Sequence, residues 1–242
     1  MKLYKLLLIV FLLSGFSTLN AQKFYRFKAD VSVKDKLANN TYRLTMGKVY
    51  YDKIYRKIVY DLTFPKKETL VVQDTTMFKI NEKGILVSSN KTVLMPEFTV
   101  FHLALTGKLF DYGINAMQSE KSIYKVGKVE KTTQGVKTTW EPADDYFAKY
   151  FGNIVMLNKD KRLDAMVFYN VEGQIVSRQF FKKYTSVKGI QFPQEVTMIS
   201  YGEDGTKNIQ LTTYKNVVID QTDEDEKYRY RIPITKSIKS VK

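Results

Sequence analysis

The stretch GKVYYDKIYRKIVYDLTFPKKETLVVQD, residues 47–74, carries the pattern that decides the fold. Residues 58, 60, 62 and 64 are large and apolar, whereas Asp61 stands among the residues that alternate with them. Because successive side chains of a β-strand point to opposite faces, this pattern predicts a strand with one apolar face and one solvent face. Its four tyrosines and one phenylalanine either fill a sheet core or line a space meant for an apolar molecule.

Segments of the same kind, rich in aromatic and β-branched residues, recur along most of the chain. Turn sequences such as NEKG and GEDGT separate many of them, and short links between consecutive strands indicate antiparallel pairing. A sheet of this size must curl or close. We therefore expect a mainly β fold, a single curled antiparallel sheet that forms an unclosed β-barrel of about ten or eleven strands covered by one or two helices. Candidate strand segments, from which these strands are expected to form, lie at 23–33, 41–51, 56–64, 69–73, 77–80, 84–90, 92–95, 153–159, 162–170, 174–187, 192–202 and 207–219, with one more candidate before Pro233.

The helical signal is confined to the middle of the chain. Residues 96–113, PEFTVFHLALTGKLFDYG, place apolar side chains three and four residues apart, with Pro96 at the start and Gly113 just past the end. This spacing predicts one amphipathic helix. The segment 142–153, PADDYFAKYFGN, predicts a short second helix or a loop.

The first residues indicate export. A basic start, an apolar run too short to span a bilayer and a small residue at position 21 predict a signal peptide over residues 1–21, cleaved after Ala21. Residues 22–242 are then expected to form one domain in the periplasm. The chain has no cysteine, so it carries neither a disulfide nor the lipid-modified cysteine of a bacterial lipoprotein.

The charge balance is basic, with 39 Lys and Arg against 25 Asp and Glu. Such a balance favours anionic partners, which outside the cytoplasm are lipid headgroups, lipopolysaccharide or acidic glycans rather than nucleic acid. The alternative is that lysines solvate the outer faces and edges of the sheet. We expect a monomer whose basic surface, Lys53, Arg56 and Lys57, lies near the mouth of the concavity.

Residues for catalysis or metal binding are sparse. The only histidine, His102, falls on or beside the apolar face of the expected helix, where a core-edge role is expected. One histidine and no cysteine exclude the usual zinc sites, and the acidic run 223–226 lacks the pattern of a calcium loop. No nucleophile or phosphate-loop motif occurs. We expect no metal, no cofactor and no enzymatic activity.

Two stretches together resemble the LolA/LolB-like group of periplasmic lipoprotein carriers and acceptors. The first stretch, residues 47–80, contains a glycine–aromatic strand, a basic stretch, a strand that ends in Pro65 and a strand with the sequence LVVQD. The second stretch, towards the C-terminus, contains VKGIQFPQEVTM, NVVID and the aromatic pair Tyr228 and Tyr230 before Pro233. The resemblance implies an unclosed barrel whose hydrophobic cavity receives acyl chains without a cofactor. The helix that precedes the family's first strand is not matched. The carriers' basic residue before proline is not matched either, and Lys53, Arg56 and Lys57 compete for its place.

The function expected from these observations is a carrier or chaperone that binds an acylated lipoprotein or another lipid during outer-membrane sorting. One alternative is a non-enzymatic accessory subunit docked on an outer-membrane protein complex, with a core filled by its own side chains. Another is a cofactor-free enzyme on the same fold. The apolar wall expected to bind the ligand comprises Ile58, Tyr60, Leu62, Phe64, Leu70, Val72, Phe78, Ile80, Phe101, Leu105, Val167 and Tyr169.

Overall fold

One antiparallel sheet contains all the strands of the computed structural model, which describes residues 23–92, 94, 96–114 and 122–233. It has thirteen strands. The first six are β1 Arg26–Lys36, β2 Tyr42–Asp52, β3 Lys57–Phe64, β4 Glu68–Gln73, β5 Thr76–Asn81 and β6 Leu86–Lys91. The other seven are β7 Tyr124–Thr132, β8 Gly135–Pro142, β9 Ile154–Lys159, β10 Arg162–Tyr169, β11 Ile175–Val187, β12 Ile190–Tyr201 and β13 Lys207–Ile219.

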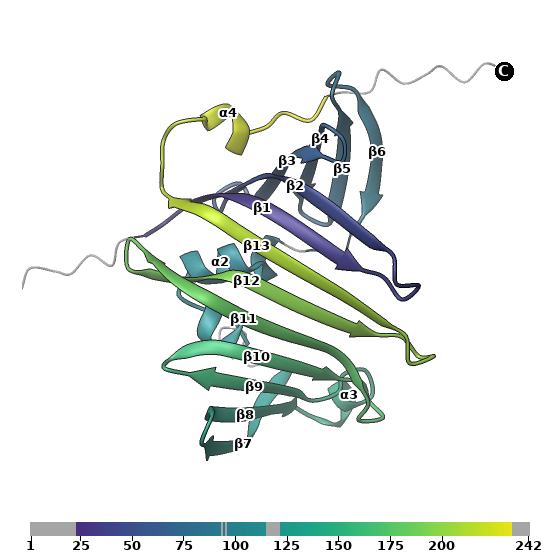
Figure 1. Cartoon of the computed structure of the whole chain (residues 1–242). Coiled ribbons are helices and arrows are strands. Elements are labelled where there is room, and N and C mark those ends of the chain that lie inside the picture. Colours follow the sequence, from purple (N-terminus) through teal and green to yellow (C-terminus); the bar gives the residue numbers. More distant parts are fainter. Residues whose placement is uncertain (1–22, 93, 95, 115–121, 234–242) are drawn as a thin grey trace, which may run out of the picture.

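The strand order is β6-β5-β4-β3-β2-β1-β13-β12-β11-β10-β9-β8-β7, so two runs of consecutive hairpins meet where the first strand pairs with the last (Figure 1). Phe27 stands opposite Ile219 in that central pairing. The edge strands β6 and β7 do not pair with each other, so the barrel stays open. The expected mainly β, unclosed antiparallel architecture is confirmed, with a higher strand count.

The sequence pattern missed β7 and β8, and for β7 the reason is its exposure. β7 reads YKVGKVEKT and is mostly exposed, because it is an edge strand with one side towards solvent. Lysines on an edge strand suppress pairing with other chains, and they also hide the apolar alternation that identifies a strand. Conversely, the strands expected at 92–95 and before Pro233 are not formed by the described residues there.

The segment between β6 and β7 crosses the inner face of the sheet as short helical turns and not as the single helix expected from its spacing. They are the 3-10 turn η1 Pro96–Phe98, the helix α2 Val100–Leu105 and the 3-10 turn η2 Leu109–Asp111. Gly107 adopts a positive φ of 69°, which ends a right-handed helix. The segment therefore bends with the curved sheet. A short helix α3, Asp145–Ala148, forms in the second helical candidate, capped by the carboxylate of Asp144.

The main core lies between α2 and the inner face, the side of the sheet that α2 covers. At its centre the ring of Phe27 lies 4.7 Å from that of Phe192 on β12 and 5.4 Å from that of Phe101 on α2, measured between centroids. All three side chains are fully buried. The rings thus fasten α2 over the strands that join the two halves of the sheet.

The outer face carries a second apolar cluster over β2–β5, covered by the C-terminal segment. This outer cluster comprises Tyr50, Val59, Val71, Ile80 and Tyr228. Tyr228 ends a short helix, α4 Asp225–Tyr228, which lies over the sheet on the side opposite α2 (Figure 1). The alternate face of β3 was expected to be open to solvent, but Asp61 on that face pairs with Lys227 of α4 at 2.6 Å.

The signal peptide expected at residues 1–21 lies outside the described residues, as does the C-terminal tail from residue 234. Among the helices of the described part, none has the length and apolar character needed to cross a membrane.

Candidate functional site

A cavity of about 670 Å³ lies between the inner face and the helical segment. We call it the main cavity. Its walls come from strands of both halves of the sheet, from η1 and α2, and from Tyr112 just after η2. Apolar side chains dominate it, among them Val31, Val33, Tyr60, Leu62, Leu70, Phe101, Val196, Met198 and Tyr214.

Part of the wall expected from the sequence is brought together here. Tyr60, Leu62 and Leu70 line the main cavity, and Tyr60 stands opposite Leu70 across the β3–β4 pairing. Ile58 and Val72 are paired in the same way and continue this row into the fully buried core. The alternation of apolar residues in β3 and β4 therefore assigns these side chains to the correct face of the sheet.

Phe78 and Ile80 do not share that face, so their expected place in the wall is wrong. In the β4–β5 register Leu70 pairs with Lys79, which puts Phe78 and Ile80 on the outer face. Ile80 belongs to the outer cluster and Phe78 packs against it. β5 is apolar towards the outside because the C-terminal segment covers it there, and that cover was not expected from the sequence.

Val167 is also misplaced, since it faces outward beside Val155, Leu157 and Ala165. A register irregularity between Leu163 and Ala165 shifts the alternation of β10 by one residue. The inner side chains of this strand are Leu163 and Met166, with Phe168 packed beside them. Tyr169 ends β10 beside a further register irregularity, between Phe168 and Tyr169, and does not line the main cavity.

Phe64 is not part of the cavity wall, because a second register irregularity, between β2 and β3, precedes it. Gly47 pairs with Leu62, but the next residue back, Met46, pairs with Phe64. The intervening Thr63 is the extra residue of a β-bulge. Phe64 follows it, is 47% exposed and does not line the main cavity.

The two helix residues expected in the wall lie one helical turn apart on α2 and border different cavities. Phe101 lines the main cavity, whereas Leu105 lines a separate cavity at the C-terminal end of α2. Several main-cavity residues were missed, notably Val196 and Met198 on β12 and Tyr214 on β13. Their strands were predicted, so alternation along 192–202 and 207–219 was the signal that could have found them.

The charged groups of the main cavity are paired. Arg43 contacts the buried carboxylate of Asp35 at 2.8 Å, and the amide of Gln210 donates to the other oxygen of that carboxylate at 2.9 Å. Lys79 pairs with Glu68 at 2.8 Å on the opposite wall. These charges are satisfied within the protein, and most of the remaining lining is hydrocarbon and aromatic, with neutral polar side chains such as Gln179, Thr45 and Thr212 among it.

The tyrosine hydroxyls of the cavity are neutral. Burial raises the pKa of Tyr60 to about 12, and burial likewise raises the pKa of Tyr214 and of Tyr112. Burial therefore favours the uncharged form of these phenols. Among the described residues, no three His, Cys, Asp or Glu side chains gather as a metal site would require. Apolar side chains therefore make up most of the lining of the main cavity, and its tyrosine hydroxyls are uncharged.

The three basic residues expected near the mouth do not line the main cavity. Lys53 lies over the ring of Tyr25, with 4.7 Å from its ammonium to the ring centroid. Arg56 pairs with Glu97 of η1 at 3.3 Å, and Lys57 donates to the backbone carbonyl of Tyr230. All three lie at or beside the turn between β2 and β3. Arg43, which lines the main cavity, stands at the opposite end of β2.

His102 fastens α2 to the sheet. Its Nδ1 lies 2.5 Å from the hydroxyl of the fully buried Tyr51. Burial lowers the pKa of His102 and so favours the neutral ring, whose tautomer sets whether Nδ1 accepts from the tyrosine hydroxyl or donates to it. The expected core-edge role agrees with this contact.

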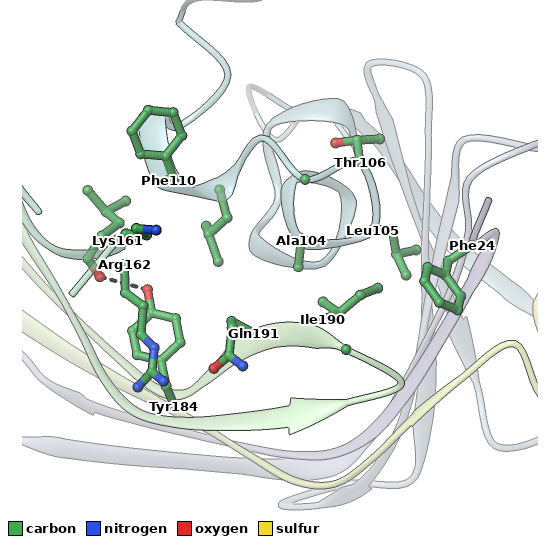
Figure 2. Close-up of a pocket in the computed structure, with 14 residues that line it drawn as sticks. Phe24, Ala104, Leu105, Thr106, Phe110, Lys161, Arg162, Tyr184, Ile190 and Gln191 are labelled. Carbon is green, nitrogen blue, oxygen red and sulfur yellow. Dashed lines mark hydrogen bonds between the residues drawn. The ribbon is translucent and has the colours of Figure 1, made fainter. Parts of the chain in front are cut away.

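A second cavity, of about 420 Å³, lies at the C-terminal end of α2 and is called the end cavity (Figure 2). The β11–β12 turn forms one side, the β9–β10 turn a second, and the segment from Ala104 to Phe110 covers it. It shares no lining residue with the main cavity among the residues that the structure describes. α2 therefore separates two spaces on the inner face.

No protein-family model matches the chain, and no curated protein sequence does. Solved structures do resemble it. A LolA superfamily protein from Nitrosomonas europaea is 10% identical with a TM-score of 0.53, over 85% of this chain and 90% of that one. A DUF1329 family protein from Desulfovibrio piger is 10% identical with a TM-score of 0.55, over 86% and 91%. A candidate outer membrane lipoprotein-sorting protein domain from Vibrio parahaemolyticus is 10% identical with a TM-score of 0.53, over 85% and 90%.

These similarities define the fold class. The chain has a LolA-like fold, an unclosed antiparallel half-barrel with helices over its inner face. At such low identity the likeness concerns the fold alone, and function must be argued from the cavities.

Proposed function

We propose that the protein is a periplasmic carrier or chaperone that binds the acyl chains of a lipoprotein or another lipid in the main cavity, as part of outer-membrane sorting. It acts as a binding protein and not as an enzyme, and it works as a monomer. The basic balance of the chain favours contact with anionic membrane surfaces during loading or delivery.

The observation that carries this proposal is the main cavity itself, about 670 Å³ of space walled by Tyr60, Leu62, Leu70 and their neighbours. Each CH₂ group moved from water into such a space contributes about 0.8 kcal/mol. Pockets that bury small ligands commonly enclose about 300–1,000 Å³. An acyl chain matches both the size and the chemistry of the walls.

The space also supports the carrier over the accessory subunit. A subunit whose inner face served only as a core would fill it with its own side chains, because protein interiors are close-packed. Here the wall residues Tyr60, Val196 and Met198 are only partly buried, whereas Phe27 and Phe192 nearby are fully buried. The inner face is packed beneath α2 and open beside it.

A pair of tryptophan substitutions on neighbouring residues tests the proposal. Thr212 lines the main cavity, and Thr213 faces the opposite side of β13. Thr212→Trp should fill the cavity and abolish saturable binding of an apolar fluorescent probe such as N-phenyl-1-naphthylamine. Thr213→Trp adds the same ring outside and should leave binding unchanged. Circular dichroism of both variants checks that the sheet is intact.

Native mass spectrometry of protein purified from its own periplasm identifies the ligand. The wild type should carry a mass that matches a lipid or lipopeptide, and Thr212→Trp should not. Equal probe binding by both tryptophan variants, together with a lipid-free wild type that copurifies with a membrane protein, would replace the carrier with the accessory subunit.

A further inference from the structure

The end cavity is charged at one end and mostly apolar at the other (Figure 2). Lys161 and Arg162 lie at one end below the ring of Phe110, Gln191 lies in the middle, and Leu105, Ile190 and Phe24 lie at the other end with Thr106 beside them. Such a division is typical of a site for a molecule with a polar head and an apolar tail, because each part meets matching surface.

The charged end carries two exposed cations, which follow Asp160 in the β9–β10 turn. Of the described residues that line the end cavity, only Lys161 and Arg162 carry a charge. Neither forms an ion pair within the described part of the chain, and Asp164, the next acidic residue along β10, is held by Lys182 at 2.7 Å. Two neighbouring cations without a carboxylate partner attract an anion.

Arg162 is held in place for this role by a tyrosine. Its guanidinium lies over the ring of Tyr184, 5.5 Å from the centroid, and the Tyr184 hydroxyl donates to the backbone carbonyl of Leu163 at 2.6 Å (Figure 2). Stacking leaves the N–H groups at the edge of the guanidinium available, and these are the groups that bind carboxylate or phosphate.

The apolar end is buried hydrocarbon. Leu105 and Phe24 are 6% and 8% exposed, and Ile190 packs against the same core. An apolar tail placed between the charged end and these side chains would be shielded from water, and α2 would not have to move.

We propose that the end cavity is a second binding site, for an anionic amphiphile whose carboxylate or phosphate lies against Lys161 and Arg162 and whose tail lies against Leu105 and Ile190. This site goes beyond the proposed function, since α2 separates it from the main cavity. Its occupant need not be the cargo.

The test uses four probes below their micellar concentrations: dodecyl phosphate, dodecanoate, neutral dodecyl maltoside and inorganic phosphate. Binding is measured by isothermal titration calorimetry to wild-type protein and to Thr212→Trp, in which the main cavity is blocked. Both should bind dodecyl phosphate or dodecanoate at the end cavity. The stronger of the two identifies the head group.

Two variants, made in the Thr212→Trp background so that the main cavity does not contribute, remove the end cavity in different ways. The double change Lys161→Gln and Arg162→Gln removes the charges and should weaken binding of the anionic amphiphile by about tenfold or more, because hydrogen bonds to charged groups are the strong ones. Gln191→Trp should fill the cavity and abolish binding. The matched control, Lys83→Gln with Lys91→Gln, removes the same charge from the β5–β6 hairpin at the other edge of the sheet and should bind like the wild type.

Three results overturn the inference. One is unchanged binding after loss of both charges or after Gln191→Trp. Another is equal binding of dodecyl maltoside, which would make the end cavity an apolar pocket without anion recognition. The third is equal binding of inorganic phosphate alone. None of these bears on the main cavity, whose own probe binding is lost only in Thr212→Trp.

Discussion

Truncating two large rings of the inner face, Phe27→Ala and Tyr60→Ala, separates packed core from cavity wall. Phe27 is fully buried, and its ring contacts those of Phe101, Phe192 and Tyr214 at centroid distances of 5.4, 4.7 and 6.3 Å. Tyr60 is only partly buried and borders the main cavity.

The two losses of stability should differ by about 2 kcal/mol or more. Phe→Ala changes in a core cost about 3–5 kcal/mol, and a new void adds about 24 cal/mol per Å³, so a ring-sized hole on the order of 100 Å³ accounts for about 2.4 kcal/mol of that cost. The lost ring contacts of Phe27 add about 0.5–1.5 kcal/mol each. Neither of these costs applies to Tyr60→Ala, because the space that the ring leaves joins a cavity that already exists.

The assay is urea unfolding of delipidated protein, followed by circular dichroism, with Tyr60→Phe as the control that keeps the ring and removes the hydroxyl. Unchanged m-values are required, so that a shift of the midpoint reports stability alone. Equal losses for Phe27→Ala and Tyr60→Ala would refute the reasoning, because Tyr60 would then be ordinary packing and the main cavity would not be open.

Three further changes probe other contacts. Gly47→Ala should destabilise the protein by about 1–3 kcal/mol or more in urea unfolding, because a Cβ there would lie 2.2 Å from the carbonyl oxygen of Asp61. His102→Asn should remove part of the pH dependence of stability: the lowered pKa of His102 means that the unfolded chain binds its proton first, so wild-type stability rises with pH in the window below about 6.5, and a non-titrating acceptor should flatten that rise. Tyr228→Ala should cost about 3–5 kcal/mol and increase binding of an apolar dye to the outer face, whereas Tyr228→Phe keeps the ring and should stay close to the wild type. A pH profile unchanged in His102→Asn, or a Tyr228→Ala variant as stable as the wild type, would contradict these contacts.

Local sequence was sufficient for the strands whose two faces differ in polarity. β3 and β4 alternate cleanly, so the pattern of apolar residues alone assigns Tyr60, Leu62 and Leu70 to the correct face. Alternation fails where a strand is irregular, because one extra residue moves every later side chain to the other face. That is what happens in β10, where Leu163 and Met166 both point inward although they are three residues apart.

Sequence also could not reveal covers that come from distant parts of the chain. Phe78 and Ile80 look like residues of an inner wall until the C-terminal segment is known to lie over them. The end cavity is formed by α2 and two turns, β9–β10 and β11–β12, and no single stretch contains it. Lys161 and Arg162 line a cavity only because α2 and these two turns come together in the folded protein.

The pairing of β1 with β13 has a consequence for the order in which the molecule is completed. Each half of the sheet, β1–β6 and β7–β13, consists of neighbouring hairpins that need only local contacts. The two halves join through a seam whose partners, such as Phe27 and Ile219, stand at opposite ends of the chain. In a chain that emerges N-terminus first, one edge of β1 therefore stays unpaired until β13 has formed. The ring of Phe27 likewise lacks its contacts with Phe192 and Tyr214 until the C-terminal strands are in place. The last strand thus both closes the sheet and completes its central core.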